Sequence, residues 1–188
     1  MIDTTERTAG FPAIETDTVV MGTAETPMGA FGAVFTARGL ACLSFPGDGL
    51  VGCAAWVQRQ MPSAHVVDEH PALEALSAQL TGYFNGTVRD FSVPLDLRGT
   101  PFQLEVWQAL QQIPYGEVRS YGVIARAIGR PKAVRAVGMA NHDNPVPIIV
   151  ACHRVIGSNR RLTGYGGGLD LKERLLRLEG VLLGEKSA

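Results

Sequence analysis

Two kinds of hydrophobic pattern divide the first half of the chain into predicted strands and helices. Short runs rich in β-branched and aromatic residues at 18–23, 30–36 and 40–45 predict strands, with a hairpin turn at Ala37–Gly39. Helices are predicted at 50–60 and 71–84, and the second begins with proline and repeats leucine at helical spacing. Residues 91–97 indicate a last short strand or a linker, in which Pro94 would mark an edge.

Helical spacing dominates the second half. Thr100, Pro101 and Gln103 form a helix-start signature, and the predicted helix continues to Ile113. Ser120 is predicted to cap a helix over 121–128. A further helix is predicted from Arg130–Pro131 to about residue 140, with Val134 and Val137 facing inward.

The last two helices, joined by Gly-x-Pro, are typical of a helix-turn-helix, although a short αα-hairpin in a core is the commoner source of this pattern. The second helix would expose Lys132 and Arg135 among small residues that include Ala136 and Gly138. Such a surface suits close approach to a nucleic-acid backbone or minor groove without sequence choice.

Charge separates the two halves of the 188-residue chain, whose net charge is −1. Residues 1–99 carry 5 basic and 11 acidic side chains, whereas residues 100–188 carry 12 and 7. Within 119–161, eight basic residues accompany only Asp143. This asymmetry indicates contact with a polyanion, and a solvated basic face is the alternative.

Composition excludes several classes of protein. With 46% hydrophobic and 19% charged residues the chain is expected to fold, and no apolar run reaches the roughly 18 residues of a membrane span. The acidic segment 1–17 resembles neither a signal nor a transit peptide, so a loose leader is expected. Three cysteines without a C-x-x-C pair argue against a disulfide framework and for a reducing cytoplasm.

No metal and no cofactor is predicted. Four residues of the first half could in number bind zinc, but their spacing matches no zinc motif; they are Cys42, Cys53, His65 and His70.

The stretch 144–157 carries the most chemical information. Ile148–Val150 is predicted to form a short buried β-like run that brings Cys152 and His153 to the edge of the basic region. A thiol becomes a strong nucleophile when a neighbouring His or Arg lowers its pKa. In an extended segment neighbours face opposite sides, so a water or a third residue would link the imidazole to the sulfur. A buried structural cysteine and a Cys-His hydrolase are the alternatives.

Residues 149–157 resemble the active-site motif I-[IV]-P-C-H-R-V of the O6-alkylguanine-DNA alkyltransferases. Further stretches agree in order and spacing: Pro101–Gln103 with Val106–Trp107, Ile113–Glu117, Ser120–Tyr121, Arg135–Gly138, Asn144–Pro145, Leu162–Gly168 and Lys172–Gly180. The resemblance is strong over 96–180. In the first half it is limited to the layout and to Thr26–Gly29, which is similar to S-P-[LIM]-G.

The resemblance implies two domains after the leader. Residues 18–95 would form an α/β domain, a ribonuclease-H-like small sheet with helices. Residues 96–184 would form a mainly α domain with a winged-helix-like helix-turn-helix. The implied activity is DNA repair: O6-alkylguanine, and O4-alkylthymine with it, is flipped out of double-stranded DNA, and its alkyl group moves irreversibly to the protein's own cysteine. A cytoplasmic monomer without membrane contact is expected.

The resemblance also implies a role for each site residue. Cys152 would accept the alkyl group, His153 would remove its proton through a water, and Glu179 would orient the imidazole. Tyr121 would press on the phosphate and donate a hydrogen bond to the guanine ring nitrogen. Arg135 would fill the gap left in the base stack after flipping, and Asn144 would be the hinge between the helix-turn-helix and the active-site segment. Lys132, Ala136 and Gly138 would lie along the DNA. The pocket would comprise the carbonyls of Cys152 and Val155 together with Tyr165, Gly166 and Gly167.

One residue departs from the motif. Ala151 replaces the proline before the nucleophile, which relaxes the loop and adds an N–H donor. A non-catalytic binder of alkylated DNA that signals to other repair factors is therefore the alternative function. Related binders replace the cysteine, whereas Cys152 is present, so the resemblance favours activity.

Overall fold

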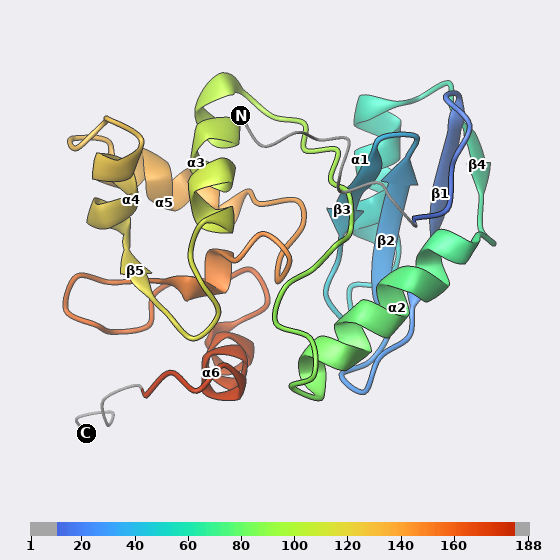
Figure 1. The fold of residues 1–188 in the computed structure, drawn as a ribbon. Coiled ribbons are helices and arrows are strands. Elements are labelled where there is room, and N and C mark those ends of the chain that lie inside the picture. Colours follow the sequence, from blue (N-terminus) through green and yellow to red (C-terminus); the bar gives the residue numbers. More distant parts are fainter. Residues whose placement is uncertain (1–10, 183–188) are drawn as a thin grey trace. The chain divides into compact units, whose positions relative to one another are not determined.

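A computed structural model describes residues 11–182 of the protein, and the chain divides into two compact units between Arg98 and Gly99. In the first unit the strands are β1 (Thr18–Ala24), β2 (Phe31–Thr36), β3 (Gly39–Leu43) and β4 (His65–Val67). They form one sheet in the order β3-β2-β1-β4, with β4 parallel to β1 and the other pairs antiparallel. Helices α1 (Val51–Gln60) and α2 (Pro71–Phe84) lie on its opposite faces (Figure 1).

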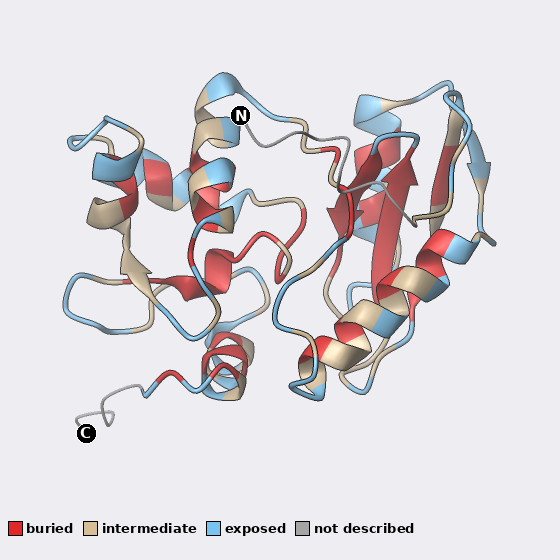
Figure 2. Cartoon of the chain, in the orientation of Figure 1, coloured by how far each residue is buried: buried red, intermediate tan, exposed pale blue. Residues whose placement is uncertain are grey.

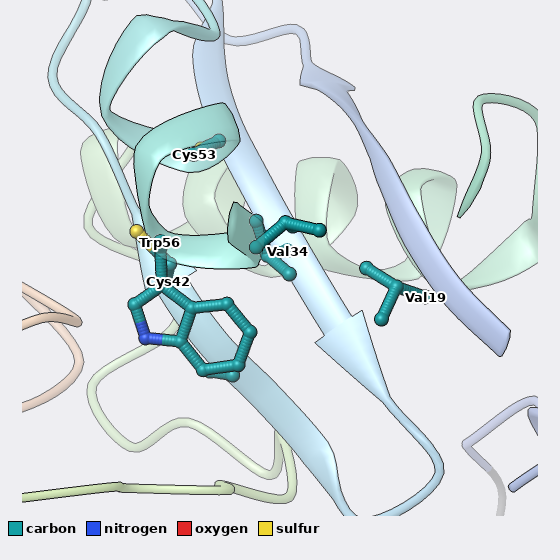
Figure 3. Close-up of a cluster of buried hydrophobic side chains, with 7 residues drawn as sticks. Val19, Val34, Cys42, Cys53 and Trp56 are labelled. Carbon is teal, nitrogen blue, oxygen red and sulfur yellow. The ribbon is translucent and has the colours of Figure 1, made fainter. Parts of the chain in front are cut away.

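Burial on both faces explains why β2 and β3 are apolar along nearly their whole length. Every residue of both strands is buried (Figure 2). On the α1 side, Trp56 packs against Val34 and Cys42 (Figure 3). On the α2 side, the ring of Phe84 stacks on Phe31 at 5.8 Å between centroids. The predicted α/β domain is confirmed.

Residues 91–97 form a linker rather than a strand. Their one bridge joins Leu95 to Leu40, and Pro94, which has no N–H, contributes only its carbonyl. The carboxylate of the buried Asp96 holds this linker through Arg38 and Arg98. Strand β4 was missed because two of its three residues are exposed and show no apolar alternation.

The predicted leader falls mostly on residues outside the described part of the chain. Residues 1–10 are not described, and of the remainder Phe11 stacks on Phe35 of β2 at 5.5 Å between centroids. Within residues 11–182, none of the helices has the length and hydrophobicity needed to cross a membrane.

The second unit is mainly helical, as predicted. Its elements are α3 (Pro101–Gln111), β5 (Arg119–Ser120), α4 (Tyr121–Ala127), α5 (Val134–His142), the 3₁₀ turn η2 (Cys152–Arg154), β6 (Val155–Ile156) and α6 (Leu169–Leu178). The capping box of Thr100 and Gln103 starts α3, and the Ser120 hydroxyl accepts from the Val123 N–H to start α4. Helices α3, α4 and α5 pack together, so α4 and α5 form the helix-turn-helix.

The second helix of the motif begins later than predicted. Residues 131–133 form a turn, and α5 starts at Val134. Because Val137, Ala140 and Asn141 set its buried face, Val134 points outward with 39% of its surface exposed. The prediction that Val134 faces inward was therefore wrong.

A two-residue parallel ladder ties the site to this motif. Arg119 pairs with Val155 and Ser120 with Ile156. The ladder joins the strand that follows η2 to the strand that precedes α4, and therefore brings Cys152 and Tyr121, 31 positions apart in sequence, into one region.

Candidate active site

The segment before Cys152 is a tight loop, not the β-like run predicted. Ile148 is buried at a left-handed φ of 73°, a conformation that costs a β-branched residue of order 1–3 kcal/mol. Pro145 and Pro147 cannot donate to a ladder, and the Asn144 side chain closes the loop instead. Its Nδ2 donates to the Val150 carbonyl at 2.8 Å, and its Oδ1 accepts from the Val146 N–H at 3.0 Å.

Cys152 begins η2, so Cys152 and His153 do not alternate as in an extended segment, and that expectation was wrong. The Cys152 N–H donates to the Val150 carbonyl at 2.7 Å, and the Cys152 carbonyl accepts from the Val155 N–H. Burial raises the pKa of the Cys152 thiol, while the Asn144 side chain and the charge of Lys172 act in the opposite direction. The resting thiol is therefore protonated, and a base is needed before it can react.

His153 and Glu179 form a fully buried pair. Nε2 of His153 lies 2.8 Å from Oε1 of Glu179, and neither side chain has exposed surface. Burial lowers the pKa of His153 despite the carboxylate, so the imidazole is neutral. Since an ionised carboxylate only accepts, Nε2 carries the proton and Nδ1 is the basic nitrogen.

Arg154 completes the charge balance around Glu179. Its Nε and Nη2 donate to the two carboxylate oxygens at 2.9 and 3.0 Å, and its Nη1 donates to the Ile113 carbonyl at 2.6 Å. Burial disfavours a charged Glu179, but His153 and Arg154 outweigh it and hold the pKa of the carboxyl at about 2. This role of Arg154 was missed, because its place in the basic stretch 119–161 indicated a surface cation.

Lys172 is a second missed residue. It is fully buried on α6, and its Nζ donates to the carbonyls of Val155 at 2.6 Å and Thr163 at 2.9 Å. Burial lowers its pKa to about 8, and the neighbouring Cys152 acts in the opposite direction. The sequence does hold a signal: 172, 175, 176 and 179 share one helical face, so a lysine there lies on the buried stripe.

Tyr121 lies at the first turn of α4, where its hydroxyl oxygen accepts from Thr163 Oγ1 at 3.2 Å. Helix α5 passes beside its ring: a Cβ built on Gly138 would be 3.9 Å from the tyrosine carbons. Lys132, Arg135 and Ala136 are exposed. Of the predicted DNA-binding residues these three are therefore exposed, whereas Tyr121 and Gly138 are half-buried and Asn144 closes the Cys152 loop.

The basic surface is smaller than the sequence indicated. Acidic residues from outside 119–161 pair with three of its eight cations: Glu117 with Arg119, Glu105 with Arg130, and Glu179 with Arg154. The five cations with no ion-pair partner among residues 11–182 are Arg126, Lys132, Arg135, Arg160 and Arg161.

In the glycine-rich loop, the backbone conformation requires a glycine at Gly168, which was not among the predicted pocket residues. Gly168 has φ 85°, whereas Gly166 and Gly167 do not adopt the left-handed region. The Tyr165 ring lies 6.0 Å from Nζ of Lys172. The loop therefore contacts Lys172, whose charge in turn acts on Cys152.

Three of the four residues considered for zinc have other contacts. Cys42 and Cys53 belong to the apolar cluster under α1, and His70 Nδ1 accepts from the Ala72 N–H to cap α2. No group of three potential ligands is assembled within residues 11–182.

Two family models match the chain. The DNA-binding domain of 6-O-methylguanine DNA methyltransferase matches residues 101–181, and its ribonuclease-like domain matches residues 19–97. A methylated-DNA–protein-cysteine methyltransferase of Methanosarcina acetivorans is 57% identical over 121 residues, which are 64% of this chain and 77% of that relative. The constitutive enzyme of that name from Bacillus subtilis is 56% identical over 119 residues, 63% and 72% of the two chains. The crystal structure of Mycobacterium tuberculosis OGT in complex with DNA has TM-score 0.72 and 44% identity, and the match covers 85% of this chain and 92% of that one.

Proposed function

This chain belongs to the 6-O-methylguanine DNA methyltransferase family, and from that premise we propose that Cys152 is the acceptor of the alkyl group. The protein is a DNA-repair methyltransferase that moves the methyl group of O6-methylguanine in DNA to a protein cysteine. The observation that carries the assignment to Cys152 is the buried His153–Glu179 pair, whose histidine directly follows Cys152 in the sequence. Cys42 and Cys53 lie in the other unit, in an apolar cluster.

His153 is the general base in this proposal. Its basic Nδ1 takes the Cys152 proton through a bridging water, and Glu179 and Arg154 fix the ring and its tautomer. Burial keeps the imidazole neutral and therefore ready to accept a proton. The Lys172 ammonium stabilises the thiolate that forms.

Transfer is a displacement at the methyl carbon. The thiolate sulfur forms the S–C bond as the bond from carbon to O6 breaks, and the electron pair passes to the guanine ring. Tyr121 stabilises the departing purine by donating a hydrogen bond to its ring nitrogen. The product is a thioether, which does not leave the protein, so each molecule reacts once.

Extrusion of the base precedes the reaction, because the O6 substituent cannot be attacked in line within a duplex. The exposed Arg135 on α5 takes the vacated place in the stack, and Lys132, Ala136 and Gly138 lie along the minor groove. Asn144 links α5 to the Cys152 loop. The carbonyls of Cys152 and Val155 each accept one protein donor already, and each oxygen has a second lone pair for the exocyclic amine.

The proposal has further parts. O4-alkylthymine is a second substrate, and Tyr165, Gly166 and Gly167 line the pocket. The domains span residues 18–95 and 96–184, and the protein acts as a monomer in the cytoplasm.

Intact-mass measurement after mixing with duplex DNA containing O6-methylguanine tests the assignment. We expect one methyl group per molecule, on the peptide that contains Cys152. Cys152→Ser should abolish transfer and retain DNA binding, whereas Cys42→Ala should still be methylated. DNA binding without any methylation would support the alternative, a non-catalytic binder of alkylated DNA.

A further inference from the structure

We propose that Thr163 is a positioning residue that holds the hydroxyl of Tyr121 so that its proton points toward the extruded base; this rests on the proposed role of Tyr121. Thr163 belongs to the loop between β6 and α6, 42 positions after Tyr121. Its Oγ1 donates to the Tyr121 hydroxyl oxygen at 3.2 Å.

The backbone of Thr163 is fixed from the interior. The Thr163 carbonyl accepts from Lys172 Nζ at 2.9 Å, and the same ammonium donates to the Val155 carbonyl at 2.6 Å. Lys172 has no exposed surface, so moving Thr163 would cost a charge-assisted hydrogen bond inside the protein. Thr163 is thereby held in a fixed relation to the segment that follows Cys152.

This arrangement determines what the Tyr121 hydroxyl can do. A phenol has one proton to donate, and its oxygen can accept. While the oxygen accepts from Thr163, the proton is available to another acceptor. The accepted hydrogen bond also stabilises negative charge on the oxygen, which makes Tyr121 a stronger donor to a purine that gains negative charge.

Single-turnover transfer from duplex O6-methylguanine tests this inference in a double-mutant cycle. Thr163→Val, which keeps the shape and removes the hydroxyl, should slow transfer about three- to tenfold, the worth of one hydrogen bond. Thr163→Ser should restore the wild-type rate. In a Tyr121→Phe background, Thr163→Val should have no further effect, because phenylalanine has no oxygen to hold. Ser158→Ala, at an exposed position of the same loop, should leave the rate unchanged.

The outcomes distinguish a failure of the role inferred for Thr163 from a failure of the role proposed for Tyr121. If Tyr121→Phe transfers as fast as wild type, the role of Tyr121 fails and the inference fails with it. If Tyr121→Phe is slow while Thr163→Val is normal, only the inference is overturned. Equal slowing by Thr163→Val in both backgrounds would assign Thr163 a purely structural role and would also overturn it.

Discussion

Oε1 of Glu179 lies 2.8 Å from Nε2 of His153, in a place where neither side chain meets solvent. The same carboxylate also accepts two hydrogen bonds from Arg154 and one, at 3.3 Å, from the Gly116 N–H. One carboxylate thus fixes the imidazole and neutralises a buried guanidinium. Function and stability depend on the same group.

Acid should destabilise the protein through Glu179. Its pKa is about 2 in the folded state against an ordinary value of 4.5, so its contribution is complete above pH 4.5 and is lost as the pH falls toward 2. The difference corresponds to about 3 kcal/mol. Urea unfolding between pH 7 and 3 measures the decline.

Glu179→Gln should lower the stability at pH 7 by about 3–5 kcal/mol, because Arg154 keeps its charge without a partner. Its stability should then fall less than that of wild type between pH 4.5 and 2. Glu105→Gln removes the exposed partner of Arg130 and should cost about 0–1 kcal/mol at pH 7. Parallel pH curves for wild type and Glu179→Gln would contradict the depressed pKa.

Lys172 should set the pH at which transfer begins. Its charge lowers the pKa of Cys152, so Lys172→Gln, which keeps a donor and removes the charge, should move the rise of the single-turnover rate to higher pH. At neutral pH the rate should fall about tenfold for each unit by which the Cys152 pKa rises. Arg177→Gln removes an exposed cation from the same helix and serves as the control. An identical pH profile for wild type and Lys172→Gln would exclude the electrostatic role.

Local signals predicted most of the fold. Helix α2 has the predicted limits because a proline, a leucine period and a following glycine agree, and the capping box of Thr100 and Gln103 is present. The errors arose where tertiary contacts determine whether an element forms and where it begins. Strand β4 exists through pairing with β1, and the start of α5 depends on which residues its neighbours bury.

The site was harder to predict from the sequence, because its charged residues pair with partners that are far away along the chain. Arg154 and Glu179 are 25 positions apart, and Arg130 and Glu105 are also 25 apart, so counting charges within 119–161 overestimated the basic surface. The loop at Ile148 was missed for another reason. A buried apolar run indicates a strand, whereas two prolines and the Asn144 side chain impose a turn.

Arg135 should contribute to duplex binding more than Arg130 does. Arg135 is exposed without an ion-pair partner among residues 11–182, whereas both oxygens of Glu105 already hold Arg130. Arg135→Ala should slow transfer in duplex DNA more than transfer from a free-base substrate, and Arg130→Ala should affect both little. Equal losses on both substrates would assign Arg135 a structural role.

Ala151 is the central residue of an inverse γ-turn, and this geometry predicts that proline is accepted there. Its φ of −75° and ψ of 56° close the hydrogen bond from the Cys152 N–H to the Val150 carbonyl at 2.7 Å. Proline has the same φ, and within residues 11–182 the Ala151 N–H donates no hydrogen bond that would be lost. Ala151→Pro should therefore stabilise the protein by about 0.4–1 kcal/mol through the unfolded chain.

The transfer rate of Ala151→Pro should equal or exceed that of wild type, because a stiffer turn holds the thiol nearer its attack geometry. Ala151→Gly is the matched opposite change: it loosens the turn and should lower both the thermal midpoint and the single-turnover rate. Because Ala151 is buried, the pyrrolidine ring of the introduced proline needs space in the interior. The thermal midpoint of Ala151→Pro measures whether the ring fits. A large loss of stability and rate in Ala151→Pro would mean that the turn cannot hold a proline, and the proposed contacts of the Cys152 and Val155 carbonyls with the base would then be withdrawn.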